Sequence, residues 1–177
     1  MKVYRRSTVL VFLALFFSSS DAASTINIFF SNDTPFDFTI KPSAANYCID
    51  DFDTEPFTLS SRGNRTYYAT VQDDCDNANI TFDYSQTYNP VPPENARAII
   101  GTLTYQHFQQ GADWKAELHM QLTPPVSDPK LVLFRTACGD KFLYCGSAPV
   151  TLPSKNFFAS FTVIPVVVTW GLGALTR

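Results

Sequence analysis

The sequence predicts an all-β protein: an antiparallel β-sandwich of roughly nine or ten strands, stabilised by disulfide bonds. Three observations lead to this fold class. Apolar and polar side chains alternate with a period of two in many short runs, which is typical of strands that bury one face. Turn-forming residues separate these runs, and no helical periodicity of useful length interrupts them. The chain also contains four cysteines, an even number that favours disulfide pairing.

In the first half of the chain, the alternation predicts a series of short strands. The first covers residues 25–31 and the second residues 36–40, with the turn Asn32-Asp33-Thr34-Pro35 between them. Lys41-Pro42-Ser43 is expected to end the second strand, because proline lacks the amide proton that a strand ladder needs. Further strands are predicted at residues 57–60, 67–71 and 80–84, and the proline-rich segment 89–95 is predicted to be a surface loop.

The second half contains the clearest hairpin, with arms Ile99–Phe108 and Trp114–Leu122. One face of the second arm is apolar and the other is polar, which is typical of an antiparallel sheet with one wet face. With residues 109–113 as the loop, the register places Trp114 or Lys115 opposite His107. The remaining strands are predicted at residues 131–136, 142–144 and 157–163.

The amino-terminal segment has the three parts of a secretory signal peptide. Lys2, Arg5 and Arg6 form a basic start, residues 7–17 form an apolar core too short to cross a bilayer, and small residues follow. We expect cleavage after Ala22, so that residues 1–22 are a signal peptide and residues 23–177 are a single β-sandwich domain. The predicted location is extracellular, or periplasmic if the source is bacterial.

The four cysteines, Cys48, Cys75, Cys138 and Cys145, all follow the signal peptide. In an exported chain they indicate two disulfides, for which three pairings are possible. We favour Cys48–Cys75 and Cys138–Cys145, because the members of each pair lie at neighbouring turns of the predicted strands. A zinc site is the competing interpretation; its spacing is wrong, since there is no C-x-x-C and neither histidine lies near a cysteine.

Three N-x-[ST] sequons, at Asn32, Asn64 and Asn79, are possible N-glycosylation sites. They matter only if the source is eukaryotic, in which case the protein would be a glycoprotein. Ser and Thr are frequent in this chain, so sequons also arise in it by chance.

The net charge of the chain indicates which classes of binding partner are unsuitable. Loss of the signal peptide would remove three positive charges and one negative charge, which changes the formal net charge from −3 to −5. Nucleic acid is therefore not a predicted partner, because its phosphates need an excess of Lys and Arg. The same balance disfavours docking on anionic lipid, although a membrane partner stays open as an alternative.

The sequence offers few signs of catalysis or cofactor binding. The sequence contains no G-x-S-x-G, no H-E-x-x-H, no phosphate loop and no dinucleotide fingerprint. The two histidines are His107, near the hairpin tip, and His119, which is expected on a wet strand face beside Glu117 and Lys115. We predict no catalytic residue, no cofactor and no metal ligand, while paired carboxylates keep a hydrolase open as an alternative.

Acidic residues concentrate around the first two cysteines. Asp50, Asp51, Asp53 and Glu55 follow Cys48, and Asp73, Asp74 and Asp76 flank Cys75. A Cys48–Cys75 bond is expected to bring both groups to one end of the domain, where calcium is a candidate ligand. No known calcium-loop spacing is matched, so we interpret these residues as solvated turn acids and expect little stabilisation by calcium.

The carboxyl-terminal stretch allows three interpretations. Residues 156–176 carry no charge and are numerous enough to cross a membrane. Gly146-Ser147-Ala148, a mostly polar spacer and an apolar tail follow one another in the order of a lipid-anchor signal. The alternation of Ala159, Phe161 and Val163 with Phe158, Ser160 and Thr162 favours a last strand instead, so that residues 157–177 are an apolar strand and tail of a soluble protein.

The first strand, the turn Asn32-Asp33-Thr34-Pro35 and the second strand resemble the start of several secreted β-sandwich proteins, including thaumatin-like proteins and aegerolysin-type cytolysins. The resemblance covers about one hairpin, and the dense cysteine framework of thaumatin-like proteins is absent. It implies a secreted β-sandwich and assigns neither a family nor a site residue.

Together these observations favour a secreted, non-enzymatic β-sandwich protein that recognises a ligand, a surface, a glycan or a protein partner through loops at one end of the sandwich. Two alternatives stay open. The aromatic richness and the apolar carboxyl terminus fit a membrane-active toxin or cytolysin, and the many carboxylates fit a secreted hydrolase.

Overall fold

The computed structural model describes residues 24–88, 97–123, 132–153 and 157–165, and these residues form twelve strands and no helix. The all-β prediction is confirmed. Two short strands, β3 and β11, were not predicted. The strands are β1 (Ser24–Asn32), β2 (Phe38–Ala45), β3 (Ile49–Phe52), β4 (Phe57–Leu59), β5 (Asn64–Val71), β6 (Asn77–Tyr88), β7 (Arg97–Gln110), β8 (Asp113–Leu122), β9 (Val132–Cys138), β10 (Leu143–Tyr144), β11 (Val150–Leu152) and β12 (Phe157–Pro165).

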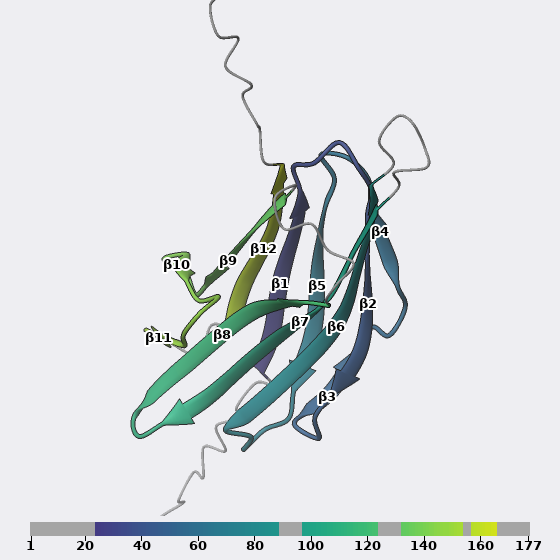
Figure 1. The fold of residues 1–177 in the computed structure, drawn as a ribbon. Coiled ribbons are helices and arrows are strands. Elements are labelled where there is room, and N and C mark those ends of the chain that lie inside the picture. The colour runs from purple at the N-terminus through teal and green to yellow at the C-terminus, as the bar shows by residue number, and fades with distance from the viewer. Residues whose placement is uncertain (1–23, 89–96, 124–131, 154–156, 166–177) are drawn as a thin grey trace, which may run out of the picture.

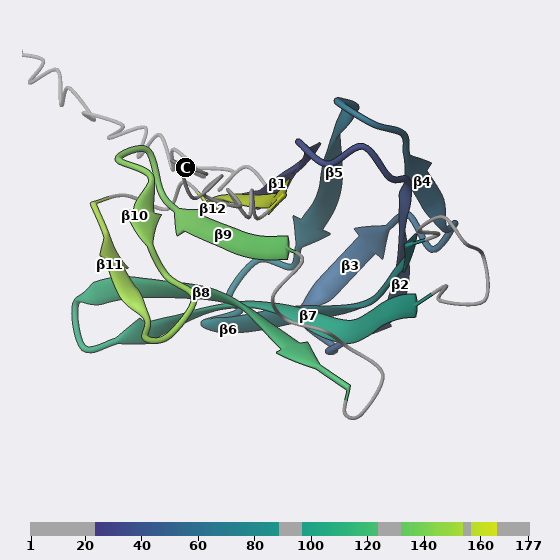
Figure 2. The same ribbon diagram turned by 45° about the horizontal axis from the view of Figure 1, so that its top comes forward.

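The strands form two six-stranded sheets that pack face to face as a sandwich (Figures 1 and 2). One sheet has the order β10-β9-β12-β1-β5-β3, and the other has the order β11-β8-β7-β6-β2-β4. In Figure 2, β9, β12 and β1 lie in one layer and β8, β7 and β6 in the layer below. All recorded strand pairs are antiparallel except one, so the predicted architecture is confirmed as well.

The exception is the parallel pair β1 and β12, which places the first and last described strands side by side, with Ile26 opposite Phe157. β12 also pairs with β9, so it lies inside the sheet and not at its edge. The prediction that Phe157–Val163 forms a strand is therefore confirmed. The tail, residues 166–177, lies outside the described residues. Among the described residues, none forms a helix long and apolar enough to cross a membrane.

The core lies between the two sheets and contains many of the aromatic side chains. Phe30 is at its centre: its ring meets those of Phe57, Phe82 and Phe161 edge-on, with centroids 5.4, 5.6 and 6.1 Å apart. Edge-to-face contacts of this kind add to the free energy of burial. Burial in the core therefore explains much of the aromatic richness of the chain.

Two local predictions were wrong. β2 does not end at Pro42: this residue lies opposite Phe82 of β6, and the strand continues to Ala45 after an irregularity between Pro42 and Ala44. A bulge lets a strand accommodate a proline without ending.

In the hairpin, Ala116 and not Trp114 or Lys115 lies opposite His107, because the turn has two residues, beginning with Gly111 at φ 66°. The predicted loop at residues 89–95 lies outside the described residues.

Both favoured disulfides are present, and none of the four cysteines is free. The Cα atoms are 5.7 Å apart in Cys48–Cys75 and 5.9 Å apart in Cys138–Cys145. The first bond ties the residue before β3 to the loop between β5 and β6, and the second closes the short segment that contains β10. Disulfides are typical of oxidising compartments outside the cytosol.

The structure argues against a glycan at the first sequon. Asn32 is fully buried, and its Nδ2 donates hydrogen bonds to the carbonyl oxygens of Phe36, Leu59 and Ser60. Its Oδ1 accepts from the backbone N–H of Thr34, 3.0 Å away. A glycan on Nδ2 has no space in this packed network, so we withdraw Asn32 as a candidate. Asn64 is exposed and Asn79 is half-buried, and both stay predictions.

Candidate functional site

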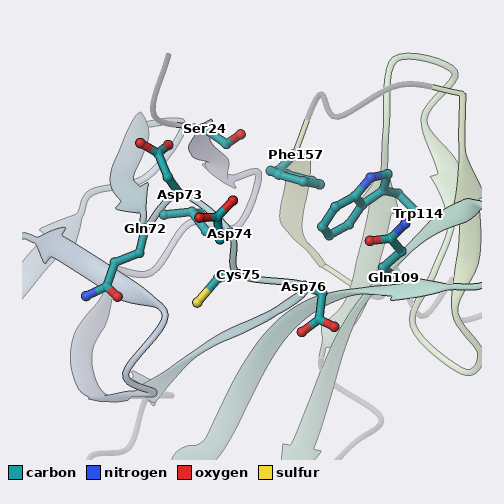
Figure 3. A pocket seen from close by; sticks show the side chains of 10 residues that line it. Ser24, Gln72, Asp73, Asp74, Cys75, Asp76, Gln109, Trp114 and Phe157 are labelled. Carbon is teal, nitrogen blue, oxygen red and sulfur yellow. The ribbon is translucent and has the colours of Figure 1, made fainter. Parts of the chain in front are cut away.

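A partly enclosed recess lies at one end of the sandwich, where β1, β8 and β12 begin and β5 and β7 end. Its volume is about 390 Å³, which lies within the range of about 300–1,000 Å³ typical of small-ligand sites. Figure 3 shows the side chains of the loop 72–76 on one side and those of Gln109, Trp114 and Phe157 on the other. We call this recess the end pocket; Ser24, Val71, Gln72, Asp73, Asp74, Cys75, Asp76, Gln109, Trp114 and Phe157 line it.

The acidic loop of the end pocket is held in place at several points. The Cys48–Cys75 disulfide ties it to the residue before β3, and the N–H of Gln72 donates to the carbonyl of Cys48. The N–H of Gln109 donates to the carbonyl of Asp76, which joins the loop to the end of β7. Asp74 has φ 67°, a left-handed conformation that Asp adopts more readily than most residues. The loop is thus pre-organised with its carboxylates outward.

Aromatic side chains form the opposite wall and the floor. The rings of Trp114 and Phe157 meet at an interplanar angle of 64°, with centroids 5.2 Å apart. Behind them lies His107, which is fully buried and stacks on Phe157 with a centroid distance of 3.6 Å. Neither ring nitrogen of His107 has a partner among the described residues. Burial lowers the pKa of His107 to about 4, so the imidazole is neutral at neutral pH.

The charged side chains that line the end pocket are all acidic. Asp73, Asp74 and Asp76 are exposed, no ion pair is recorded for them among the described residues, and no Lys or Arg is among the ten lining residues. A shallower recess of about 460 Å³ adjoins the pocket, shares Asp76 and Gln109 with it, and adds Glu117. Like charges on one concave surface focus a negative potential, which attracts cations.

The other predicted acids do not join this pocket. β3 lies antiparallel to β5, with Ile49 opposite Val71 at the pocket end, and leads away from it. Asp53 accordingly lies near the start of β5, where its carboxylate pairs with Arg65 at 3.1 Å. The expected convergence of all the acids at one end is therefore wrong. Within the described ranges, no group of three or more His, Cys, Asp or Glu side chains is arranged to hold a metal ion.

The two histidines lie on opposite faces of the same sheet. His119 lies half-buried on the outer face, opposite Thr104, as expected for a wet strand face. His107, for which the sequence analysis made no prediction of burial, lies in the core. The sequence contains a pattern that could have predicted this burial: Leu103, Tyr105 and His107 follow one another at a period of two on the inward face.

No protein-family model and no curated protein matches the sequence. The fold and the site define a disulfide-linked β-sandwich with an acidic, aromatic-walled pocket at one end.

Proposed function

We propose that this chain is a secreted, non-enzymatic recognition module that binds a basic group of a peptide or protein partner in the end pocket. The observation that carries the proposal is a concave site in which three carboxylates face an aromatic wall, with no ion pair to them and no Lys or Arg beside them in the part of the chain that the structure describes. An ammonium or guanidinium group complements such a site in charge.

The three carboxylates and Trp114 contribute in different ways. Each unit charge at about 4 Å contributes about 1 kcal/mol in water and more where solvent is partly excluded. An indole ring adds about 0.5–1 kcal/mol by a cation–π contact at an exposed site. Because the carboxylates are exposed, the attraction is screened by salt, and we expect weak to moderate affinity that depends on ionic strength.

The proposal can be tested by calorimetry with trilysine as the probe and triglycine as the neutral control. We expect trilysine to bind at about 20 mM salt and to lose most of its affinity at about 200 mM, because screening shortens the range of the field. Triglycine is expected not to bind. Replacing Asp73, Asp74 and Asp76 with Asn should reduce the trilysine affinity about tenfold or more. Asn retains the side-chain shape and tolerates the left-handed conformation of position 74.

The matched control removes the same charge at positions outside the end pocket. Asp33, Asp37 and Asp83 are exposed and lie outside the end pocket, so their replacement by Asn changes the net charge equally. This variant should bind trilysine with an affinity close to that of the native protein. Equal losses in both triple variants would show that trilysine responds only to net charge, and the proposed site would be rejected.

The two alternative functions, a membrane-active protein and a hydrolase, stay predictions, and each has its own test. A membrane-active protein should release dye from liposomes, and a hydrolase should show activity in a screen of glycan substrates. Burial of many of the aromatic residues in the core removes part of the argument for the membrane-active alternative. Three carboxylates at one pocket keep the hydrolase worth testing, with Asp-to-Asn variants as its control.

A further inference from the structure

A second recess lies on the side of the sandwich, far along β8 from the end pocket. No strand pairing is recorded between β8 and β9 among the described residues, and a recess of about 250 Å³ opens between them. β11 pairs with β8 only at Trp114–Ala116, and β10 pairs with β9 only at Ala137 and Cys138. We call this recess the side pocket; it is lined by Met120, Leu122, Val132, Leu133, Phe134, Thr136, Tyr144 and Gly146.

The side pocket is apolar and uncharged, in contrast to the end pocket. None of its eight lining residues is charged. Its volume exceeds the roughly 150 Å³ that suffices for an apolar cavity to bind benzene. The inward face of Phe134 forms part of the aromatic core, stacked on Phe161 at 5.6 Å. Complementarity of charge therefore favours an uncharged, mainly apolar ligand.

Several exposed apolar side chains lie on β9, which forms one wall of the side pocket, and on the segment that follows it. Of the seven large hydrophobic residues that are exposed in the described chain, Leu133, Phe142, Leu143 and Tyr144 lie on β9 and on the segment closed by Cys138–Cys145. Phe142 has φ 51°, an unusual conformation for a bulky residue, and its ring is 61 % exposed. Of these four, Leu133 and Tyr144 also line the side pocket, so its rim presents apolar surface to solvent, a feature associated with binding sites.

One polar atom in the wall of the side pocket has no hydrogen-bond partner within the described ranges. Thr136 is 3 % exposed, and its Oγ1 makes no hydrogen bond among the described residues. Gly146 lies directly beside this hydroxyl: a Cβ at position 146 would overlap Oγ1 and would lie 3.0 Å from the Tyr144 ring. An unpartnered buried hydroxyl is costly, so a ligand atom that hydrogen-bonds to it would gain free energy.

From these observations we infer that the side pocket binds a small amphipathic ligand, an uncharged apolar chain or ring that carries one hydrogen-bonding group. The apolar part lies against Met120, Leu122 and Phe134. The polar group meets the hydroxyl of Thr136 once the Tyr144 ring, 62 % exposed at the rim, turns aside. This site is independent of the end pocket and of the function proposed for it.

The test uses toluene and p-cresol, which share a ring and a methyl group and differ in one hydroxyl. Met120 is the only methionine besides Met1, so methyl-¹³C-methionine labelling of the mature protein gives a resonance inside the side pocket. Both probes are expected to shift the Met120 resonance saturably. Failure of both probes to shift it would overturn the inference, as would contacts in the free protein between the Met120 methyl and residues 124–131 or 166–177, because the chain itself would then fill the pocket.

The role of the hydroxyl is tested by Thr136→Val, with Thr104→Val on the outer face of β7 as the matched control. In Thr136→Val the affinity of p-cresol relative to toluene should fall by about twofold to tenfold, the effect of one hydrogen bond. In Thr104→Val this ratio should equal that of the native protein. An unchanged ratio in Thr136→Val would contradict the inference, and melting temperatures of both variants verify that each is folded.

Discussion

The imidazole of His107 lies flat on the ring of Phe157, with centroids 3.6 Å apart and planes 5° apart. The two residues belong to opposite sheets, β7 and β12. Phe157 also lines the end pocket, so this stack connects the core of the sandwich to the floor of the site. The protonation state of a buried histidine therefore bears on the stability of the site.

Acid is expected to destabilise the protein through His107. The pKa of this imidazole is lowered by burial from 6.5 to about 4 in the folded state, whereas the unfolded chain retains a value near 6.5. Below pH 6.5 the unfolded state binds a proton that the folded state does not, so stability falls as the pH falls. The loss should approach about 3 kcal/mol by pH 4. Denaturant titrations between pH 7 and pH 4 measure it.

The control for this prediction is His107→Leu, which replaces the imidazole with an apolar side chain of similar size that does not titrate. Its free energy of unfolding should depend less on pH over the same range, because the group that titrates is gone. An NMR titration of the native imidazole gives an independent reading. A titration midpoint near 6.5 in the folded protein, or an equal pH dependence in both proteins, would contradict the prediction.

The two disulfides are expected to contribute unequally. The sequence separations are 27 residues for Cys48–Cys75 and 7 residues for Cys138–Cys145, and the chain-entropy gain grows with loop length. Replacing both members of a pair with Ala should cost about 3.5 kcal/mol for the first and about 2.5 kcal/mol for the second. Denaturant unfolding of the two double variants measures the difference. A larger loss for Cys138–Cys145 would show that native contacts and not chain entropy dominate.

Asn32→Asp should be strongly destabilising despite its small change in shape. The substitution removes the Nδ2 donor and places an acceptor against the carbonyls of Phe36, Leu59 and Ser60. A buried acceptor without a donor costs several kcal/mol when it is charged, so we expect a loss of at least about 3 kcal/mol. Asn64→Asp, at an exposed position, is the matched control and should change stability little. Similar unfolding midpoints for both variants would refute the role of the network.

Calcium is expected to leave the melting temperature unchanged within about one degree at 1 mM calcium relative to a chelator. Asp53 pairs with Arg65 away from the loop 72–76, and no group of acids among the described residues is arranged to hold a cation. Scanning calorimetry tests this directly. A rise of several degrees that Asp74→Asn abolishes would show that the loop binds calcium after all.

The period-two alternation predicted much of the fold, because each strand buries one face. Phe157–Val163 illustrates the success: its alternation predicts a strand, and β12 shows that alternation in its burial. The alternation cannot predict which strands pair with one another. Pairing of β1 with β12 joins residues more than 130 positions apart, and no local signal marks it. The Pro42 irregularity and the two-residue turn at Gly111 were also missed, since each depends on backbone geometry.

The end pocket was only partly predictable for the same reason. The acids around Cys75 and their position at one end followed from the sequence and the favoured disulfide. The aromatic wall did not, because Trp114 and Phe157 come from strands of different sheets that only the three-dimensional packing brings together. Asp53 was wrongly assigned to the same place, since the direction of β3 along β5 cannot be read from the sequence.

The most direct test of the proposed recognition site is an NMR titration of the ¹⁵N-labelled protein with trilysine at low salt. The account predicts saturable shifts of the amides of Asp73, Asp74 and Asp76 and of the indole N–H of Trp114, which can be told apart from that of Trp170, the other tryptophan. The amides of Asp33, Asp37 and Asp83 should stay in place. No saturable shift, or shifts spread evenly over all exposed acids, would contradict the account.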